Sequence, residues 1–111
     1  MKFQSSRADG ICIIKVDEHR IDAAGAIDFK EGVRTQLDGW EGRVVLDLSL
    51  VEFIDSSGLG AVVAVRKMLG AERNLELCNL SPPVEKVFRL TRMDRVFVIH
   101  PNRPEPLRDA V

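Results

Sequence analysis

The feature that most constrains the fold is the stretch of residues 43–70, which reads as a strand, a turn and a helix. A short, valine- and leucine-rich run over 44–48 leads to Phe53-Ile54, as expected of a strand buried on both faces. After residues 55–60, apolar side chains recur at helical spacing up to Leu69. The intervening D-S-S-G-L-G offers side-chain oxygens for a helix N-cap. It therefore displays a hydroxyl at a helix N-terminus, where an anion such as phosphate is favoured.

The rest of the chain contains further strand and helix patterns in alternation. Asp9-Gly10 between two extended runs predicts a β-hairpin. Ser81-Pro82 predicts the start of a helix, and Gly39 predicts the end of an earlier one. The other predicted strands are 2–6, 11–16, 75–78 (near a sheet edge) and 95–99, and the other predicted helices are about 23–37 and 82–91.

This order predicts an α/β fold with one domain over residues 1–111. Right-handed crossovers after the hairpin build a mixed, mainly parallel sheet of about five strands with helices packed on it. The core spans about residues 10–99, and residues 100–111 form a proline-rich tail with at most a short final helix. Ligand and partner surfaces in such sheets gather outside the strand carboxyl ends, which is where residues 55–60 lie.

Composition excludes several classes of function. Sixteen basic against seventeen acidic residues give a formal net charge of −1, so no broad basic field favours nucleic acid or acidic lipid. The N-terminus lacks a signal-peptide layout, and no apolar run approaches the ~20 residues that cross a bilayer, so we expect a cytoplasmic protein without membrane insertion. Cys12 and Cys78 lack CxxC spacing and are expected as buried, reduced thiols, with no metal site.

Enzymatic interpretations of residues 55–60 find little support in the motifs. A serine hydrolase needs a GxSxG elbow, a base and an orienting acid, whereas this chain has IDSSGLG and only His19 and His100. A dinucleotide site would need a glycine where Val63 stands, and no P-loop motif is present. Two interpretations remain: a serine that merely caps the helix, and a regulated surface serine. We expect no catalysis and no cofactor.

The D-S-S-G-L-G motif, after an apolar strand and before an Ala/Val-rich helix, resembles the signature of the anti-sigma factor antagonists of the STAS domain family. Ile21-Asp22 is similar to the family's apolar-Asp element. Residues 75–78, followed by Ser81-Pro82 and a Val-Phe helix, resemble the family's late strand and helix. The resemblance covers roughly residues 10–99.

The resemblance implies a phosphorylation switch. The acceptor is the serine directly after the aspartate, here Ser56, with Ser57 as the alternative. The dephosphorylated form would bind a serine-kinase anti-sigma factor and free a sigma factor, and a PP2C-type, metal-dependent serine phosphatase would reverse the modification. The implied partner-binding residues are Asp22, Asp55, Ser57, Gly58, Leu59 and Gly60.

Structural alternatives stay open at several of these positions. Asp22 is equally explained as a helix N-cap, the glycines as turn geometry, and Leu59 as a buried first-turn staple. The alternative function is a STAS interaction subunit that docks without phosphorylation, for example in a membrane transporter system. The chain departs from the family pattern at His19-Arg20, where a glycine is usual, and in its short tail. We expect both departures to affect partner choice more than the fold.

Overall fold

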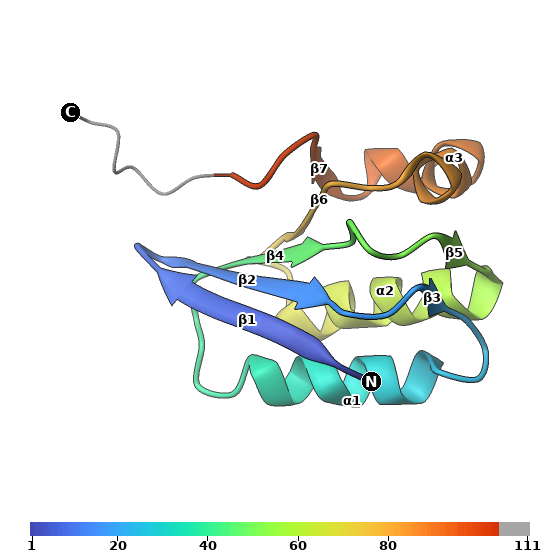
Figure 1. Cartoon of the computed structure of the whole chain (residues 1–111). Helices are drawn as coiled ribbons and strands as arrows, with labels where there is room; N and C mark the ends of the chain where they lie inside the picture. The colour runs from blue at the N-terminus through green and yellow to red at the C-terminus, as the bar shows by residue number, and fades with distance from the viewer. Residues whose placement is uncertain (105–111) are drawn as a thin grey trace.

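A five-stranded mixed sheet forms the centre of the molecule, with the strand order β1-β2-β4-β6-β7 (Figure 1). The computed structural model describes residues 1–104. β1 pairs antiparallel with β2, and every other neighbouring pair in this sheet is parallel. The predicted α/β class and mainly parallel sheet are therefore confirmed. The strands are β1 (Phe3–Ala8), β2 (Ile11–Val16), β4 (Arg43–Asp47), β6 (Leu75–Cys78) and β7 (Val98–His100).

The predicted hairpin joins β1 and β2 through Asp9 and Gly10. Both residues have positive φ, 50° and 82° respectively, which is the backbone that a two-residue turn of this kind requires. Ala8 pairs with Ile11 next to the turn, and Phe3 pairs with Val16 at the open end. At the open end of the hairpin, Phe3 packs against the core.

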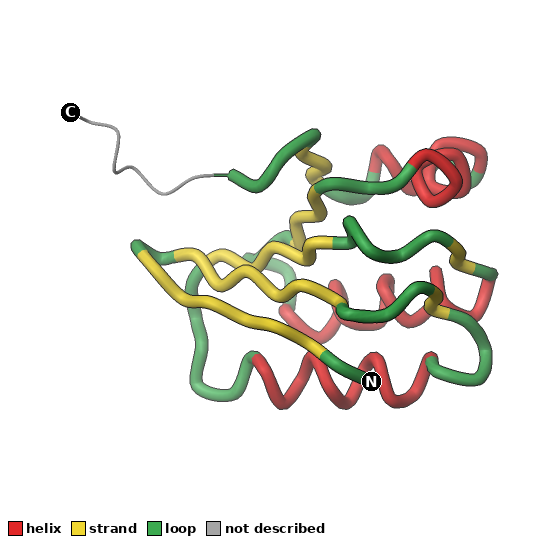
Figure 2. The backbone as a smooth tube through the Cα atoms, viewed as in Figure 1, coloured by secondary structure: helices red, strands yellow, loops and turns green. Residues whose placement is uncertain are grey.

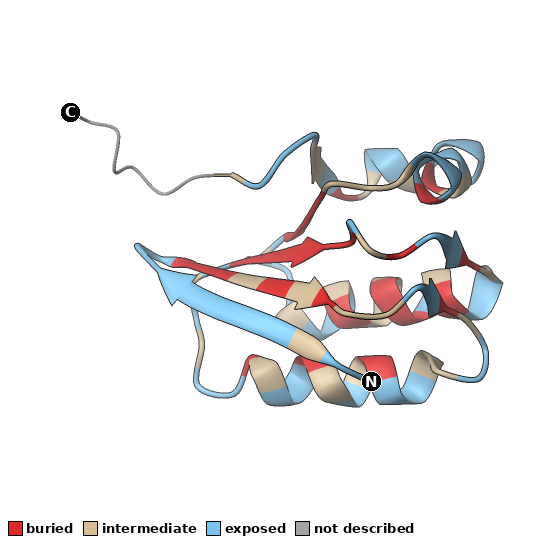
Figure 3. Ribbon diagram, in the orientation of Figure 1, coloured by how far each residue is buried: buried red, intermediate tan, exposed pale blue. Residues whose placement is uncertain are grey.

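The helices are α1 (Ala26–Gln36), α2 (Ser56–Leu69) and α3 (Pro82–Leu90). α1 and α2 lie side by side on one face of the sheet, and α3 lies near β6 and β7 (Figure 1). Figure 3 shows that the buried positions are concentrated in the inner strands and on the inward sides of the helices. The buried helix residues are Phe29 and Val33 of α1, Gly58, Ala61, Val62 and Val65 of α2, and Val84 and Phe88 of α3.

Two further strands were not predicted as separate elements. β3 (Arg20–Ile21) and β5 (Phe53–Ile54) pair in parallel and form a ribbon outside the main sheet. Figure 2 shows these short strands at the end of the molecule where α1 and α2 begin. Ile21 and Ile54 are buried, so the ribbon is anchored to the core by one side chain from each strand.

Two predicted boundaries need correction. α1 begins at Ala26 and not at residue 23, because residues 22–25 form a turn in which the N–H of Gly25 donates to the carbonyl of Asp22 at 3.0 Å. The strand predicted at 95–99 starts at Val98, because Arg92 takes a left-handed backbone with φ 60° and leads into the 3-10 turn η1 (Met93–Arg95). Residues 105–111 of the predicted tail lie outside the described residues.

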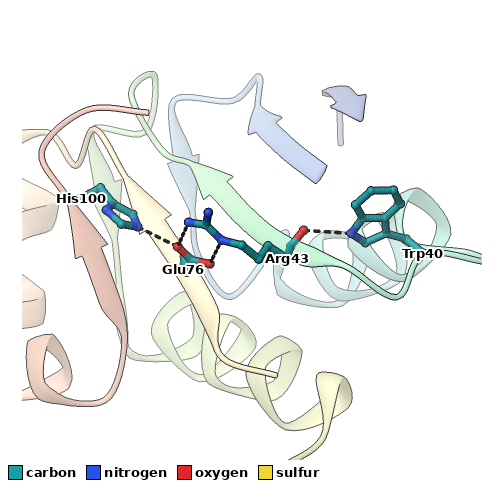
Figure 4. A network of polar contacts seen from close by, with 4 residues as sticks. All are labelled: Trp40, Arg43, Glu76 and His100. Atoms are coloured by element: carbon teal, nitrogen blue, oxygen red, sulfur yellow. Dashed lines mark hydrogen bonds and ion pairs between the residues drawn. The ribbon is translucent and has the colours of Figure 1, made fainter. Parts of the chain in front are cut away.

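The face of the sheet opposite the helices carries a polar network (Figure 4). Glu76 of β6 accepts two hydrogen bonds from Arg43 of β4, at 2.9 and 2.7 Å, and lies 2.7 Å from Nε2 of His100 on β7. The hydrogen bond from Arg43 is the largest cause that lowers the pKa of Glu76, and burial opposes it. Three strands of the sheet are thus joined through one nearly buried carboxylate.

Both cysteines are buried free thiols, as predicted. Burial raises the pKa of Cys78 to about 12, so this thiol stays protonated at neutral pH. Its strand, β6, has all four residues buried and lies between β4 and β7, one position in from the edge of the sheet.

Candidate functional site

Asp55 sets the start of α2. Its backbone is extended, with φ −104° and ψ −174°, and its Oδ1 atom accepts the N–H of Gly58 at 2.8 Å. This is N-cap geometry, in which a side-chain oxygen satisfies an N–H of the first turn. The cap is therefore Asp55, and Ser56 and Ser57 occupy the first two helical positions. The interpretation in which a serine caps the helix is excluded.

The second oxygen of Asp55 joins two loops. Its Oδ2 atom accepts the backbone N–H of Ala23 at 3.1 Å, and the N–H of Asp55 donates to the carbonyl of Ile21 at 3.4 Å. The parallel register pairs Arg20 with Phe53 and Ile21 with Ile54. The apolar-Asp element of residues 21–22 and the 55–60 loop, far apart in sequence, therefore lie side by side at the start of α2.

Gly58 faces inward and is buried. A Cβ atom at this position would overlap the carbonyl oxygen and carbon of Ile21, so the two backbones approach more closely than any other residue type allows. Gly60 differs, because a Cβ there would meet nothing within 4 Å and the residue is exposed. The two glycines of the motif thus have different structural roles.

The remaining predicted site residues lie on the outside of this junction. Ser56 and Ser57 are exposed, and Asp22 and Asp55 are half-buried. Leu59 is half-buried and packs against the core, so part of its side chain fills the position expected of a staple. Asp22 does not cap α1, since Gly25 holds the N-cap position without a side-chain bond.

Sequence reasoning missed Arg20 and Phe53. The Nε atom of Arg20 donates to Oδ2 of Asp22 at 2.8 Å, and its guanidinium lies 4.6 Å from the centre of the Phe53 ring. The hydrogen bond from Arg20 is the main cause that lowers the pKa of Asp22, with smaller contributions from nearby backbone N–H groups. Phe53 is 44% exposed, and Ile27, in the first turn of α1, is 71% exposed. No local pattern reveals the contact between Arg20 and Phe53, because it arises from the pairing of two two-residue strands.

The sequence profile of the STAS domain matches residues 2–105 of the chain. The chain belongs to the STAS domain family. BtrV of Bordetella bronchiseptica, which is named as an anti-sigma factor antagonist, is 33% identical over 104 residues. The alignment covers 93% of this chain and 89% of the relative. An anti-sigma F factor antagonist of Paenibacillus polymyxa is 26% identical, with 86% of this chain and 92% of the relative covered.

Solved structures show the same STAS fold. The crystal structure of an anti-sigma factor antagonist from Mycobacterium paratuberculosis aligns with a TM-score of 0.78 and 27% identity, covering 98% of this chain and 89% of that one. Within residues 1–104 of this STAS domain, every helix is too short or too polar to cross a bilayer.

The two histidines lie apart from the serines at the start of α2. Neither histidine is hydrogen-bonded to a serine: His100 contacts Glu76 on the opposite face of the sheet, and His19 lies 3.7 Å from Glu52. The relatives are named as anti-sigma factor antagonists. At the start of α2, Ser56 and Ser57 present hydroxyls beside the positive end of the helix dipole.

Proposed function

We propose that this STAS domain is an anti-sigma factor antagonist that is switched by phosphorylation of Ser56. The observation that carries the proposal is an exposed serine placed immediately after the capping Asp55, at the first position of α2. The names of the relatives support the class of partner, an anti-sigma factor. The unmodified chain binds a serine-kinase anti-sigma factor and thereby releases a sigma factor. This role belongs to the cytoplasm, where the kinase obtains ATP.

The proposed binding surface surrounds the start of α2. It comprises the exposed Ser56, Ser57 and Gly60, the half-buried Asp22, Asp55 and Leu59, and the exposed apolar side chains Ile27 and Phe53. Gly58 is left out, because its backbone is covered by Ile21. A surface of this composition combines exposed apolar side chains with hydrogen-bonding groups, as protein interfaces do.

In the proposed switch, the kinase transfers the γ-phosphoryl group of ATP to the Ser56 hydroxyl oxygen. The P–O bond to ADP breaks, ADP leaves, and the hydroxyl proton passes to a base of the kinase. The product carries about −1.5 to −2 additional charge and three strong acceptor oxygens. A PP2C-type serine phosphatase restores the hydroxyl by hydrolysis and releases inorganic phosphate.

The added charge weakens the complex without refolding the antagonist. Asp55 already satisfies the N–H of Gly58, so the helix start does not depend on the serine hydroxyls. The phosphate would lie beside the carboxylates of Asp22 and Asp55, and an interface that covers it must desolvate this charge. We expect at least a tenfold loss of affinity for the kinase.

The experiment uses the full chain and the serine-kinase anti-sigma factors of the host. Each kinase is incubated with ATP and the wild-type, Ser56→Ala or Ser57→Ala chain, followed by intact-mass measurement and peptide mapping. We expect one phosphate on wild type and on Ser57→Ala, and none on Ser56→Ala. Calorimetric titration should show that Ser56→Ala still binds the kinase, whereas the chain with phosphoserine at position 56 binds at least tenfold more weakly.

Two outcomes would contradict the proposal. Phosphate retained in Ser56→Ala and lost in Ser57→Ala would move the acceptor to Ser57. Neither binding nor phosphate with any host kinase, in a chain that is folded by circular dichroism, would favour a docking subunit that works without phosphorylation.

A further inference from the structure

β3 and β5 lie beside the start of α2 (Figure 1), and the outward side of this ribbon carries charged side chains. Side chains alternate along a strand, and Ile21 and Ile54 point into the core. The residues before and after them therefore face outward. We call this surface, made by Arg20, Asp22, Phe53 and Asp55, the ribbon face.

Within residues 1–104, Arg20 is the one cationic side chain that forms an ion pair with a carboxylate of the ribbon face. It donates to Asp22 at 2.8 Å and lies over the Phe53 ring at 4.6 Å, yet its side chain remains 62% exposed. Asp55 does not compete for Arg20, because its two oxygens accept the N–H groups of Gly58 and Ala23. The guanidinium is thus held near the start of α2 by one exposed ion pair and one aromatic ring.

Next to the ribbon face, His19 and Glu52 lie 3.7 Å from each other and are both highly exposed. The neighbouring helix α3, which packs against β5, adds Glu85, Lys86 and Arg89. The carboxylates of Asp22 and Asp55, together with Glu52, would make a phosphate on Ser56 electrostatically unfavourable if no cation were present. Ser56 follows Asp55 directly, so their Cα atoms lie about 3.8 Å apart. The phosphate would therefore be added next to two carboxylates and one movable guanidinium.

We propose that Arg20 is the counter-ion of phosphorylated Ser56, exchanging the carboxylate of Asp22 for the phosphate while it stays stacked on Phe53. This inference rests on the proposed function, because it needs a phosphate at position 56. A phosphate dianion carries more charge than a carboxylate and matches the planar fork of a guanidinium with paired hydrogen bonds. An exposed ion pair such as Arg20–Asp22 contributes little and is easily exchanged.

The exchange has a second effect on the surface. Asp22 loses its cation when Arg20 turns to the phosphate, so modification of one serine alters the charge presented at two positions. Arg20 would thus act as a positioning residue that transmits the modification from α2 to the neighbouring loop.

The test uses the full chain with phosphoserine installed at position 56 by genetic encoding, so it does not depend on any kinase. The second pKa of the phosphate, ordinarily about 6, is followed by ³¹P NMR in the wild type and in Arg20→Gln. The matched control is Arg34→Gln, because Arg34 is an exposed arginine in the last turn of α1, away from Ser56. A His19→Gln background removes the neighbouring imidazole from the measurement.

We expect Arg20→Gln to raise the phosphate pKa by about 0.5–1 unit, and Arg34→Gln to change it by less than about 0.2. The ¹³C-detected pKa of the Asp22 carboxyl should rise on phosphorylation in the wild type, and should rise less in Arg20→Gln, where no cation is lost. Equal phosphate pKa values in the two arginine variants would overturn the inference. Because phosphoserine is installed directly, failure here leaves the proposed function standing, whereas failure of kinase binding leaves this result intact.

Discussion

The Oδ2 atom of Asp55 accepts the backbone N–H of Ala23 at 3.1 Å, across 32 residues of sequence. The same carboxylate caps α2 through the N–H of Gly58. One side chain therefore fixes the helix that carries Ser56 and the loop that carries Asp22. The geometry of the candidate site depends on this aspartate before any partner arrives.

Two replacements of Asp55 should destabilise the domain by different amounts. Asp55→Asn keeps one acceptor oxygen and loses the other, whereas Asp55→Ala loses both, so the free energy of unfolding should fall by about 1 and about 2 kcal/mol respectively. Urea denaturation followed by circular dichroism measures the difference. Glu72→Ala, at an exposed position, is the control and should leave stability within about 0.5 kcal/mol. Equal stability of all three variants would show that the Asp55 bonds contribute nothing net.

Replacement of either serine should leave stability nearly unchanged. Ser56→Ala and Ser57→Ala remove exposed hydroxyls that do not cap α2, so we expect changes within about 0.5 kcal/mol in the same denaturation experiment. This result matters for the functional assay, because a lost phosphate in Ser56→Ala can then be assigned to the missing acceptor. A loss of 1 kcal/mol or more would indicate that the serine itself stabilises the helix start.

The two glycines of the motif should respond in opposite directions to alanine. Gly58→Ala places a methyl group against the backbone carbonyl of Ile21, which cannot move aside cheaply, and should cost about 3 kcal/mol or more. Gly60→Ala adds a methyl group in open space within a helix and should stabilise by about 0.5–1 kcal/mol. Thermal unfolding of the pair, measured side by side, provides the check. A mild Gly58→Ala variant would mean that the β3–α2 contact can open.

The Glu76 network should make stability depend on pH. The pKa of Glu76 is lowered in the folded state, so its contribution is fully present above the unfolded value of about 4.3 and is lost as the pH falls through the folded pKa. We expect Glu76→Gln to be about 2 kcal/mol less stable than wild type at pH 7, since Arg43 and His100 lose a charged acceptor.

The difference between wild type and Glu76→Gln should shrink below about pH 4, where the wild-type carboxyl also becomes neutral. Urea unfolding over pH 3–7 gives both curves. Glu72→Gln serves as the matched control, because Glu72 is exposed. A constant difference across this range would exclude ionisation of Glu76 as the cause.

Periodicity was sufficient to predict the fold because the elements that build the sheet have clear signatures. The strand at 44–47, the α2 stripe and the Asp9-Gly10 turn each satisfy a local rule, and all of them agree with one topology. β3 and β5 could not be recognised, because two residues are too few to show a period. The shifted start of β7 follows from the left-handed backbone of Arg92. An arginine at this position does not predict such a conformation.

The candidate site was only partly visible in the sequence for a similar reason. The family resemblance gave Asp22 and the 55–60 loop as partner-binding residues, and the structure brings them side by side. The need for glycine at position 58 arises from a contact with Ile21, 37 positions earlier, so no local pattern reveals it. Arg20 and Phe53 meet only through the β3–β5 register, which the sequence pattern did not reveal.

The two-residue strands β3 and β5 also bear on how such domains diversify. Only Ile21 and Ile54 of this ribbon enter the core, so the outward positions 20, 22 and 53 can change without disturbing the packing beneath them. Copies of the gene within one genome can therefore acquire different side chains there and keep the same scaffold. On the proposed function, substitutions there would change which anti-sigma factor each copy binds, and so keep parallel pathways separate.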